Sequence, residues 1–405
     1  MNANDTHHNR MIGLMLTGIF ALMVYDFYIK LNFLDKILFW FTSPAIIFPA
    51  GVLFYNRFTK WGRENRKRID AINEIPPELL LLSPQSIYLG KDLNLDIDIF
   101  LPDNIRCRHV HLVGGSGFGK TTTFQNIMKQ DVDRGYGIII LDGKGENSFV
   151  TWLRKTMPKD RLYIFDLSDE MSMGYNPLAA GTPLEAAQRL YSSLTWSEPY
   201  YAAKSRAALQ IIFQKHFESK KKNPTLKEIS DYLDSPDSYS SFVTSPNYPP
   251  KLASEDYAGI AGLRDQVSAL CTGHLGDILS PNGRAEINLA HAQDGKVLYF
   301  RLQSSLSPQI ASTTGKLLIN HLNFLAGTVH RAKNATGSGG LTVDEKTNKT
   351  KLVPTYFDEF ATFACPEFGD LISKARSAGY ALHFSHQSKG DLEDVSKGFF
   401  GANYG

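Results

Sequence analysis

The sequence predicts an α/β fold in which a parallel sheet carries a phosphate-binding loop, an all-α insertion interrupts the sheet, and a transmembrane helical hairpin comes first. Three observations predict this fold. A glycine-rich run joins a strand pattern to a helix pattern at residues 114–122, short apolar runs of strand type recur on both sides of a helical region, and two long uncharged apolar runs lie near the N-terminus. A chain of 405 residues can hold one to three domains, and its net charge of +2 excludes a uniformly polybasic nucleic-acid binder.

The two apolar runs are expected to form transmembrane helices within residues 11–56, after a short cytoplasmic N-terminus at residues 1–10. Met11 to Tyr25 carries no charge, and Ile37 to Asn56 is uncharged over the roughly 20 residues that a span requires. A signal peptide is the alternative for the first run. It is disfavoured because no small-residue cleavage site is present and a second apolar run follows at once.

Residues 57–85 are expected to form a basic juxtamembrane linker. One acid, Glu64, is outnumbered by six bases directly after the second run, which are Arg57, Lys60, Arg63, Arg66, Lys67 and Arg68. The positive-inside rule makes this side cytoplasmic, so both chain ends lie inside. Contact with lipid headgroups is the favoured use of these charges, and contact with DNA is the alternative.

The cysteines give no sign of a metal site. Cys107, Cys271 and Cys365 are isolated from one another, and no Cys/His spacing typical of zinc occurs. Three scattered thiols suit a reducing compartment.

The run from Gly114 to Thr122 matches the phosphate-loop pattern in full, with the apolar run Cys107–Val113 before it and the helix pattern Thr121–Asp133 after it. A chance glycine-rich turn is the alternative, but it would not need this strand-to-helix order. The residues expected to bind ATP are Gly114, Gly115, Ser116, Gly117, Phe118, Gly119, Lys120, Thr121 and Thr122.

The chemistry of the loop explains its residue types. Glycines allow the backbone N–H groups to turn inward around phosphate oxygens, and the following helix adds its positive N-terminal end. Lys120 is expected to reach the β- and γ-phosphates, and the Thr121 hydroxyl is expected to ligate Mg²⁺. ATP and Mg²⁺ are therefore the expected ligands.

Residues 86–180 are expected to form the first part of the nucleotide-binding domain. Ser86–Leu89 and Leu95–Leu101 are expected to pair as an edge hairpin, whereas Gly137–Asp142 and Arg161–Asp166 have the apolar composition of buried parallel strands. The segment Asp142-Gly143-Lys144-Gly145-Glu146 follows a strand at the edge where α/β sheets bind ligands, although an ordinary turn would have the same sequence.

Residues 181–292 are expected to form an all-α domain. Four stretches carry helical periodicity, namely Leu184–Leu194, Ala202–Phe217, Leu226–Leu233 and Tyr257–Leu270. The insertion also explains why Lys120 and Asp358 lie farther apart in sequence than a bare RecA-like core requires. Its basic residues could contact nucleic acid or form a solvated face.

Residues 293–405 are expected to complete the nucleotide-binding domain. Lys296–Leu302 is expected to be a strand, Thr313–Leu325 a helix, and 332–351 a loop or protruding hairpin. A strand that begins after Pro354 would end at Asp358-Glu359, and Tyr380–Gln387 would form one more strand.

The acids at the end of the Asp358 strand suggest the second half of an active site. Asp358 is expected to hold Mg²⁺ through water and Glu359 to polarise the attacking water. Gln387 is expected to lie beside the γ-phosphate, and a surface glutamine is the alternative. The histidines of these strands are expected to be packed or hydrogen-bonded and not to bind a metal.

These motifs, in this order, resemble the type IV secretion coupling proteins, the TraG/TraD-type conjugation ATPases. Besides the phosphate loop, the likeness rests on 142–146, Tyr175-Asn176-Pro177-Leu178, 357–362, 374–379 and Ser385-His386-Gln387-Ser388. The resemblance implies a hexameric ATPase of the bacterial inner membrane. Its partners would be membrane lipids, relaxase-bound single-stranded DNA or protein substrates, and the channel of a type IV secretion system.

The resemblance also implies that Arg376 acts as an arginine finger at the nucleotide of the neighbouring subunit; a helix-surface ion pair is the alternative. Two features depart from the family. Gly143 stands where the family usually has proline, which is expected to preserve the turn, and the chain ends earlier than family members do.

Two other functions stay open from the sequence. A translocase of the FtsK/HerA group shares the catalytic layout but usually carries a long linker and a terminal DNA-reading domain. A non-catalytic receptor would bind ATP and dock substrates without productive hydrolysis.

Overall fold

The computed structural model describes residues 52–53, 60–245, 249–336, 343–344, 349–350 and 352–388. The chain divides into two compact units, one of residues 1–80 with 91–97 and the other of residues 81–90 with 98–405. The transmembrane hairpin predicted for 11–56 lies outside the described residues except for Val52 and Leu53. Among the helices described, none combines the length and the apolar character needed to cross a bilayer.

The linker predicted for 57–85 contains regular structure. It holds the helix α4 (Lys60–Glu74) and the 3₁₀ turn η1 (Pro77–Leu80). The predicted hairpin follows as a separate two-stranded sheet of β1 (Ser86–Asp92) and β2 (Ile97–Pro102). Within the larger unit, the Tyr88 N–H donates to Oε1 of Gln130 at 2.8 Å, which fastens β1 to the first helix of the main domain.

The main domain contains a six-stranded sheet in which all neighbouring strands are parallel. Across the sheet the strands are β3 (Val110–Val113), β10 (Tyr380–His386), β9 (Val353–Asp358), β4 (Ile138–Asp142), β6 (Val297–Arg301) and β5 (Leu162–Asp166). The four inner strands are buried along their whole length, as their apolar composition predicts.

Two strand predictions need correction. The run Cys107–Val113 is not one buried strand, because the short helix α5 (Asp103–Arg106) ends at Cys107 and only Val110–Val113 forms the half-exposed edge strand β3. The strand at Asp358 begins at Val353 and includes Pro354. Proline is tolerated there because the register with β4 begins only at Thr355, so the β4 ladder needs no N–H at residue 354.

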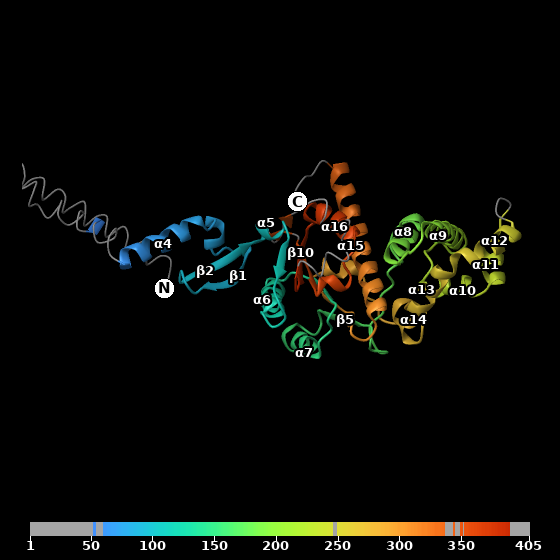
Figure 1. The fold of residues 1–405 in the computed structure, drawn as a ribbon, viewed down its shortest axis with the longest axis horizontal. Helices are drawn as coiled ribbons and strands as arrows, with labels where there is room; N and C mark the ends of the chain where they lie inside the picture. The colour runs from blue at the N-terminus through green and yellow to red at the C-terminus, as the bar shows by residue number, and fades with distance from the viewer. Residues whose placement is uncertain are drawn as a thin grey trace, which may run out of the picture. The chain divides into compact units, whose positions relative to one another are not determined.

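Helices cover both faces of the sheet (Figure 1). Ile138 and Ile140 pack with α6 (Lys120–Asp133) and α7 (Asn147–Thr156), whereas Ile139 and Leu141 point to the opposite core. That second core includes α15 (Pro308–Thr336), α16 (Glu367–Ala378) and α8 (Pro183–Ser193). The alternation along β4 therefore produces a three-layer α/β fold.

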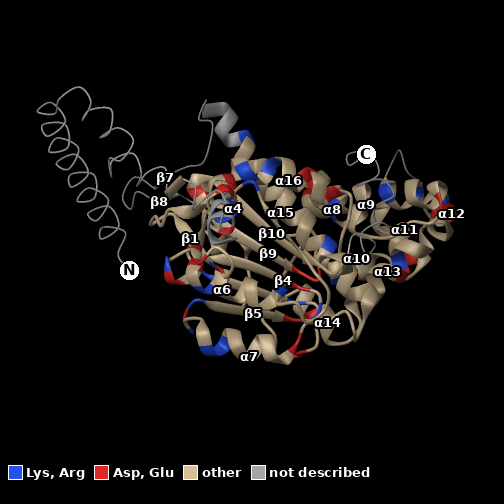
Figure 2. Cartoon of the chain, turned by 60° about the vertical axis from the view of Figure 1, so that its left-hand side comes forward, with Lys and Arg blue, Asp and Glu red and all other residues tan. Residues whose placement is uncertain are grey.

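The insertion between β5 and β6 is helical where the structure describes it. Its elements are α8, α9 (Pro199–Lys220), α10 (Leu226–Tyr232), α11 (Pro236–Val243), α12 (Pro250–Tyr257), η2 (Ala258–Ile260), α13 (Ala261–Cys271), α14 (His274–Leu279) and η3 (Leu289–Ala292). Thr182 and Thr225 each form a capping box with a glutamate, which fixes where α8 and α10 begin. Figure 2 shows both signs of charge on the helices of the insertion.

The segment predicted as a loop or hairpin at 332–351 combines a helix end with a hairpin. The helix α15 continues to Thr336, and two short antiparallel strands follow, β7 (Val343–Asp344) and β8 (Lys349–Thr350). After β9, the 3₁₀ turn η4 (Phe360–Thr362) leads toward α16.

A buried charge network fastens α6 to the sheet. The guanidinium of Arg106 donates to both carboxylate oxygens of Asp131 at 2.7 Å and to Asp103 at 2.8 Å. Arg134 donates to the same two acids, and the Tyr356 hydroxyl of β9 donates to Asp131. Each carboxylate has several donors, so this network holds the helix that begins at the phosphate loop.

Candidate nucleotide-binding site

The glycine-rich loop lies between the end of β3 and the start of α6. Gly117 and Gly119 have φ values of +79° and +85°, in the left-handed region that favours glycine. Gly119 is the residue before the first helical turn of α6. The loop therefore has the backbone conformation that directs N–H groups toward an anion at a helix N-terminus.

Lys120 folds back over this loop. Its ammonium donates to the carbonyl oxygens of Gly114 at 2.5 Å and of Gly115 at 3.1 Å. The charge is thus held directly above the cradle of N–H groups, at the place where the phosphate-loop pattern requires a cation.

Thr121 and Asp358 meet across the sheet edge. The Thr121 hydroxyl donates to Oδ2 of Asp358 at 3.0 Å, and the Ser385 hydroxyl at the end of β10 donates to Oδ1 at 2.5 Å. Ser385 is fully buried, so its hydroxyl holds the Asp358 carboxylate from the interior of the protein. Ser385 has no role among the site residues expected from the sequence; its place two residues before Gln387, at the end of a strand pattern, is the only local signal for it.

Glu359 follows in a strained conformation. Its φ and ψ are both 52°, a left-handed conformation that is uncommon for a residue with a side chain. Nε2 of the exposed Gln387 donates to Oε1 of Glu359 at 3.2 Å. The structure therefore brings together the two residues predicted to act on the attacking water and the γ-phosphate.

Asp142 lies beside Asp358, because β4 and β9 are in register at these positions. The N–H groups of Lys144 and Gly145 donate to Oδ1 of Asp142 at 2.9 and 2.8 Å, and the Tyr299 hydroxyl donates to Oδ2 at 2.8 Å. Burial raises the pKa of Asp142 to about 6 in spite of these bonds. This carboxyl shapes the loop that follows β4.

Gly143 lies in a turn after β4, as expected, and the structure gives this glycine two contacts of its own. Its N–H donates to the Asp358 carbonyl at 3.1 Å, a bond that proline cannot form. A Cβ atom at this position would lie 2.7 Å from the Thr362 hydroxyl oxygen. The glycine thus lets the loop after β4 approach the backbone around Glu359.

A buried arginine holds the other side of this loop. Arg301, at the end of β6, forms an ion pair with Asp166 of β5 at 2.9 Å and donates to the Gly145 carbonyl at 2.6 Å. It also donates to Asn147 at 2.7 Å. Arg301 is not among the site residues expected from the sequence; the local signal for it is a charged residue that closes an otherwise apolar strand.

These groups surround a cavity of about 220 Å³ at the carboxyl edge of the sheet. Its walls comprise Ser116, Gly117, Gly119, Lys120, Thr121, Thr122, Lys144, Glu146, Asp358, Glu359 and Gln387. Lys144 and Glu146 form an exposed ion pair of 2.6 Å at its mouth. No cluster of three or more His, Cys, Asp or Glu side chains suited to a metal occurs among the described residues. A hydroxyl and a carboxylate are nevertheless the hard oxygen ligands that Mg²⁺ takes beside phosphate, so Thr121 and Asp358 fit this ion.

The remaining predicted site residues lie elsewhere or have structural partners. Arg376 is exposed on α16 and does not line this cavity. His109 contacts the Ile372 carbonyl, and His111 contacts His386 through their Nε2 atoms. Burial lowers the pKa of His109 and of His111. His109, His111 and His386 are therefore hydrogen-bonded, as predicted.

Part of the sequence matches a known protein family. The model of the type IV secretion-system coupling protein DNA-binding domain matches residues 98–237. A curated relative from Mycoplasma pneumoniae, an uncharacterized protein, is 32% identical over 62 residues, which are 15% of this chain and 52% of that protein. The chain thus spans about half the length of this relative.

Solved structures resemble the fold. The unbound bacterial conjugative coupling protein TrwBdeltaN70 superposes with a TM-score of 0.56 and 14% identity, over 79% of this chain and 69% of that one. The plasmid coupling protein TrwB in complex with ADP and Mg²⁺ gives 0.53 and 15%, over 80% and 72%. These likenesses show an α/β fold of the RecA type with a helical insertion. Together with the family match they confirm the resemblance to coupling proteins.

Proposed function

We propose that this chain is a membrane-anchored coupling ATPase that recruits relaxase-bound single-stranded DNA, or protein substrates, to a type IV secretion channel and drives their transfer. The observation that carries the proposal is the hydrogen bond of 3.0 Å from Thr121 to Asp358, which joins a complete phosphate loop to the acid of β9. The match of residues 98–237 to a coupling-protein DNA-binding domain supports the choice of substrate.

The residues around this bond have distinct tasks in hydrolysis. Lys120 and the loop N–H groups would bind the β- and γ-phosphates, and Thr121 with Asp358 would hold Mg²⁺, which would offset phosphate charge. Glu359 orients the attacking water and accepts its proton. Gln387 positions the Glu359 carboxylate through their hydrogen bond.

The ATPase acts as a ring, in which each site uses one group from the next subunit. Arg376 is exposed on α16 and does not line the cavity of its own chain, as expected of a residue that acts on the neighbouring subunit. A fixed guanidinium there offsets charge on the transferring phosphoryl group. A head-to-tail contact of this kind closes into a ring when its rotation divides a full turn evenly, and we propose six subunits.

Residues 11–56 anchor the ring in the bacterial inner membrane, with the basic residues after them at the cytoplasmic lipid headgroups. The soluble domains then face the cytosol, where they meet the relaxosome and the channel components. A reporter fused after Tyr55 is expected to read cytoplasmic, and a periplasmic reading would contradict this orientation.

Steady-state ATP hydrolysis by the detergent-purified full chain tests the function. We expect single-stranded DNA to stimulate turnover, Lys120→Ala to abolish it, and Lys129→Ala, an exposed lysine two turns along the same helix, to leave it unchanged. Undiminished turnover in Lys120→Ala would overturn the site assignment. ATP binding without turnover in the wild type would instead favour the docking receptor.

A further inference from the structure

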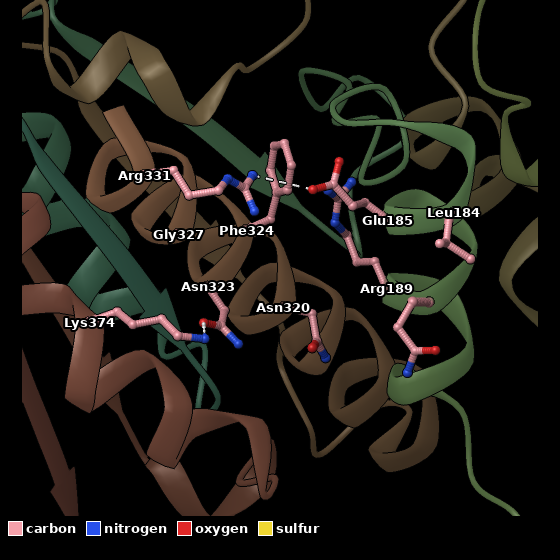
Figure 3. Close-up of a pocket in the computed structure, with 10 residues that line it drawn as sticks. Leu184, Glu185, Arg189, Asn320, Asn323, Phe324, Gly327, Arg331 and Lys374 are labelled. Carbon is pink, nitrogen blue, oxygen red and sulfur yellow. Dashed lines mark hydrogen bonds and ion pairs between the residues drawn. The ribbon is translucent and has the colours of Figure 1, made fainter. Parts of the chain in front are cut away.

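A second cavity, of about 430 Å³, lies between α8 and α15 and shares no residue with the nucleotide cavity. Figure 3 shows Glu185 and Arg189 from α8 facing Phe324 and Arg331 from α15, with Lys374 of α16 on the opposite side. The volume falls in the range of small-molecule sites. This cavity volume is larger than a single ion requires.

Arg189 forms a buried cationic wall of this cavity and is only 3% exposed. One guanidinium nitrogen, Nη1, donates to the Pro177 carbonyl at 2.8 Å. Its Nε and Nη2 atoms have no hydrogen-bond partner among the described residues. Burial lowers the pKa of Arg189. Because a desolvated cation with unused donors is costly, an anion in the cavity would offset that cost.

The other charges of the cavity leave a positive excess. Arg331 and Lys374 add two cations, and Glu185 is the single acid in the lining. Oε2 of Glu185 is already occupied by the backbone and hydroxyl of Thr182, and Oε1 accepts from Arg331 at 3.3 Å. No ion pair joins Glu185 to Arg189 in the described part of the chain, so the charge of the buried guanidinium is not neutralised there.

Polar and aromatic groups complete the lining. Asn320 and Asn323 contribute amides, and Lys374 donates to Oδ1 of Asn323 at 3.4 Å. The Arg189 guanidinium lies over the Phe324 ring at 4.8 Å, which fixes the direction of its fork. The cavity therefore has one buried cation, two less buried cations, and amides that can bind a sugar or base.

We propose that this cavity binds the phosphate group of a nucleotide-sized ligand, with Arg189 as the buried contact and Arg331 and Lys374 at the rim. Three separated cations match the several oxygens of a phosphate better than the two of a carboxylate. The phosphate can belong to a free mononucleotide or to one unit of a single strand of DNA. The second source rests on the proposed function, whereas the first does not.

Binding to the full chain distinguishes the sources. Thymidine 5′-monophosphate is titrated by calorimetry, and a fluorescein-labelled 20-mer of oligothymidylate is followed by anisotropy. Both titrations contain saturating ADP and Mg²⁺, so that the phosphate loop is filled. The readout is binding, so a chain that does not hydrolyse ATP still gives an answer.

We expect Arg189→Gln to weaken binding about tenfold and Arg331→Gln with Lys374→Gln about threefold. The double variant changes partly exposed residues and keeps the test decisive if Arg189→Gln does not fold. Arg154→Gln with Lys155→Gln, two exposed bases on the opposite face of the sheet, is the matched control. If the pocket variants weaken binding of the mononucleotide, the ligand is a free nucleotide. If they weaken binding of the oligonucleotide alone, the ligand is DNA. Failure of both probes to bind, or binding that the pocket variants leave equal to the control, would overturn the proposal.

Discussion

Ser385 connects the sheet to the chemistry of the site, because its buried hydroxyl donates to the carboxylate of Asp358. We expect Ser385→Ala to lower the ATP hydrolysis rate about tenfold and to destabilise the fold by about 2 kcal/mol, since the Asp358 carboxylate loses its buried hydroxyl donor and keeps only those from Thr121 and the Glu359 N–H. Hydrolysis rates and thermal unfolding of the variant measure both effects.

The control for this change is Ser373→Ala. Ser373 is exposed on α16 and donates only to the Asp370 carbonyl in its own helix. Equal rates in the Ser385 and Ser373 variants would show that the Asp358 carboxylate needs no support from β10.

His383 is a buried neutral histidine in the middle of β10. Burial, helped by the nearby Arg106, holds its pKa well below the ordinary value. The unfolded chain therefore binds more protons than the folded one below about pH 6.5, so stability falls as pH decreases through that value. We expect a lower Tm at pH 5.5 than at pH 7.5. His383→Phe keeps the ring stacked on Tyr356 and should reduce this difference; an unchanged difference would exclude His383 as its source.

At the scale of elements, Arg301 joins three neighbouring segments at the carboxyl edge of the sheet. It pairs with the buried Asp166 and donates to the buried Gly145 carbonyl and to the exposed Asn147. We expect Arg301→Met to destabilise the chain by about 3 to 5 kcal/mol, because Asp166 would stay buried and uncompensated. Thermal unfolding measures the change.

An exposed pair provides the comparison for Arg301. Lys129 and Asp133 form an ion pair of 2.5 Å on α6 with both side chains more than half exposed. Lys129→Ala should cost less than about 0.5 kcal/mol. If both variants lose the same stability, burial would not be the cause.

The sequence predicts the long elements well, and the reason is physical. Ile138–Leu141 is a continuous apolar run and Tyr380–Phe384 is apolar except for His383, so both are expected to be buried in almost any α/β arrangement. The start of β9 at Val353 was missed because the tolerance of Pro354 depends on the register with a partner strand. Short helices such as α11 and α14 have too few turns for a periodic signal.

Likewise, only some of the residues of the candidate site can be predicted from the sequence. The residues of the phosphate loop follow from a local pattern, and Asp358 with Glu359 from a strand end. The hydrogen bonds of Ser385 and Arg301 depend on which strands are neighbours, and so does the close approach of Gly143 to Thr362. The strand order is set by long crossovers and is not visible in any one stretch.

At the scale of the whole molecule, the trans role of Arg376 has its own test. We expect Lys120→Ala and Arg376→Ala to be inactive alone and to regain partial turnover when mixed, because each mixed interface can combine an intact loop with an intact arginine. Hydrolysis by the mixture, measured against each variant at the same total concentration, reports this. No recovery would place Arg376 outside the reaction.

The most direct test of the account is ATP hydrolysis by the purified chain and by Glu359→Gln, each with and without single-stranded DNA. The substitution keeps an oxygen that can accept from Gln387 but removes the base. We predict DNA-stimulated turnover in the wild type, and nucleotide binding with hydrolysis reduced at least about a hundredfold in the variant. Hydrolysis in Glu359→Gln that equals the wild type would contradict the assignment of the site.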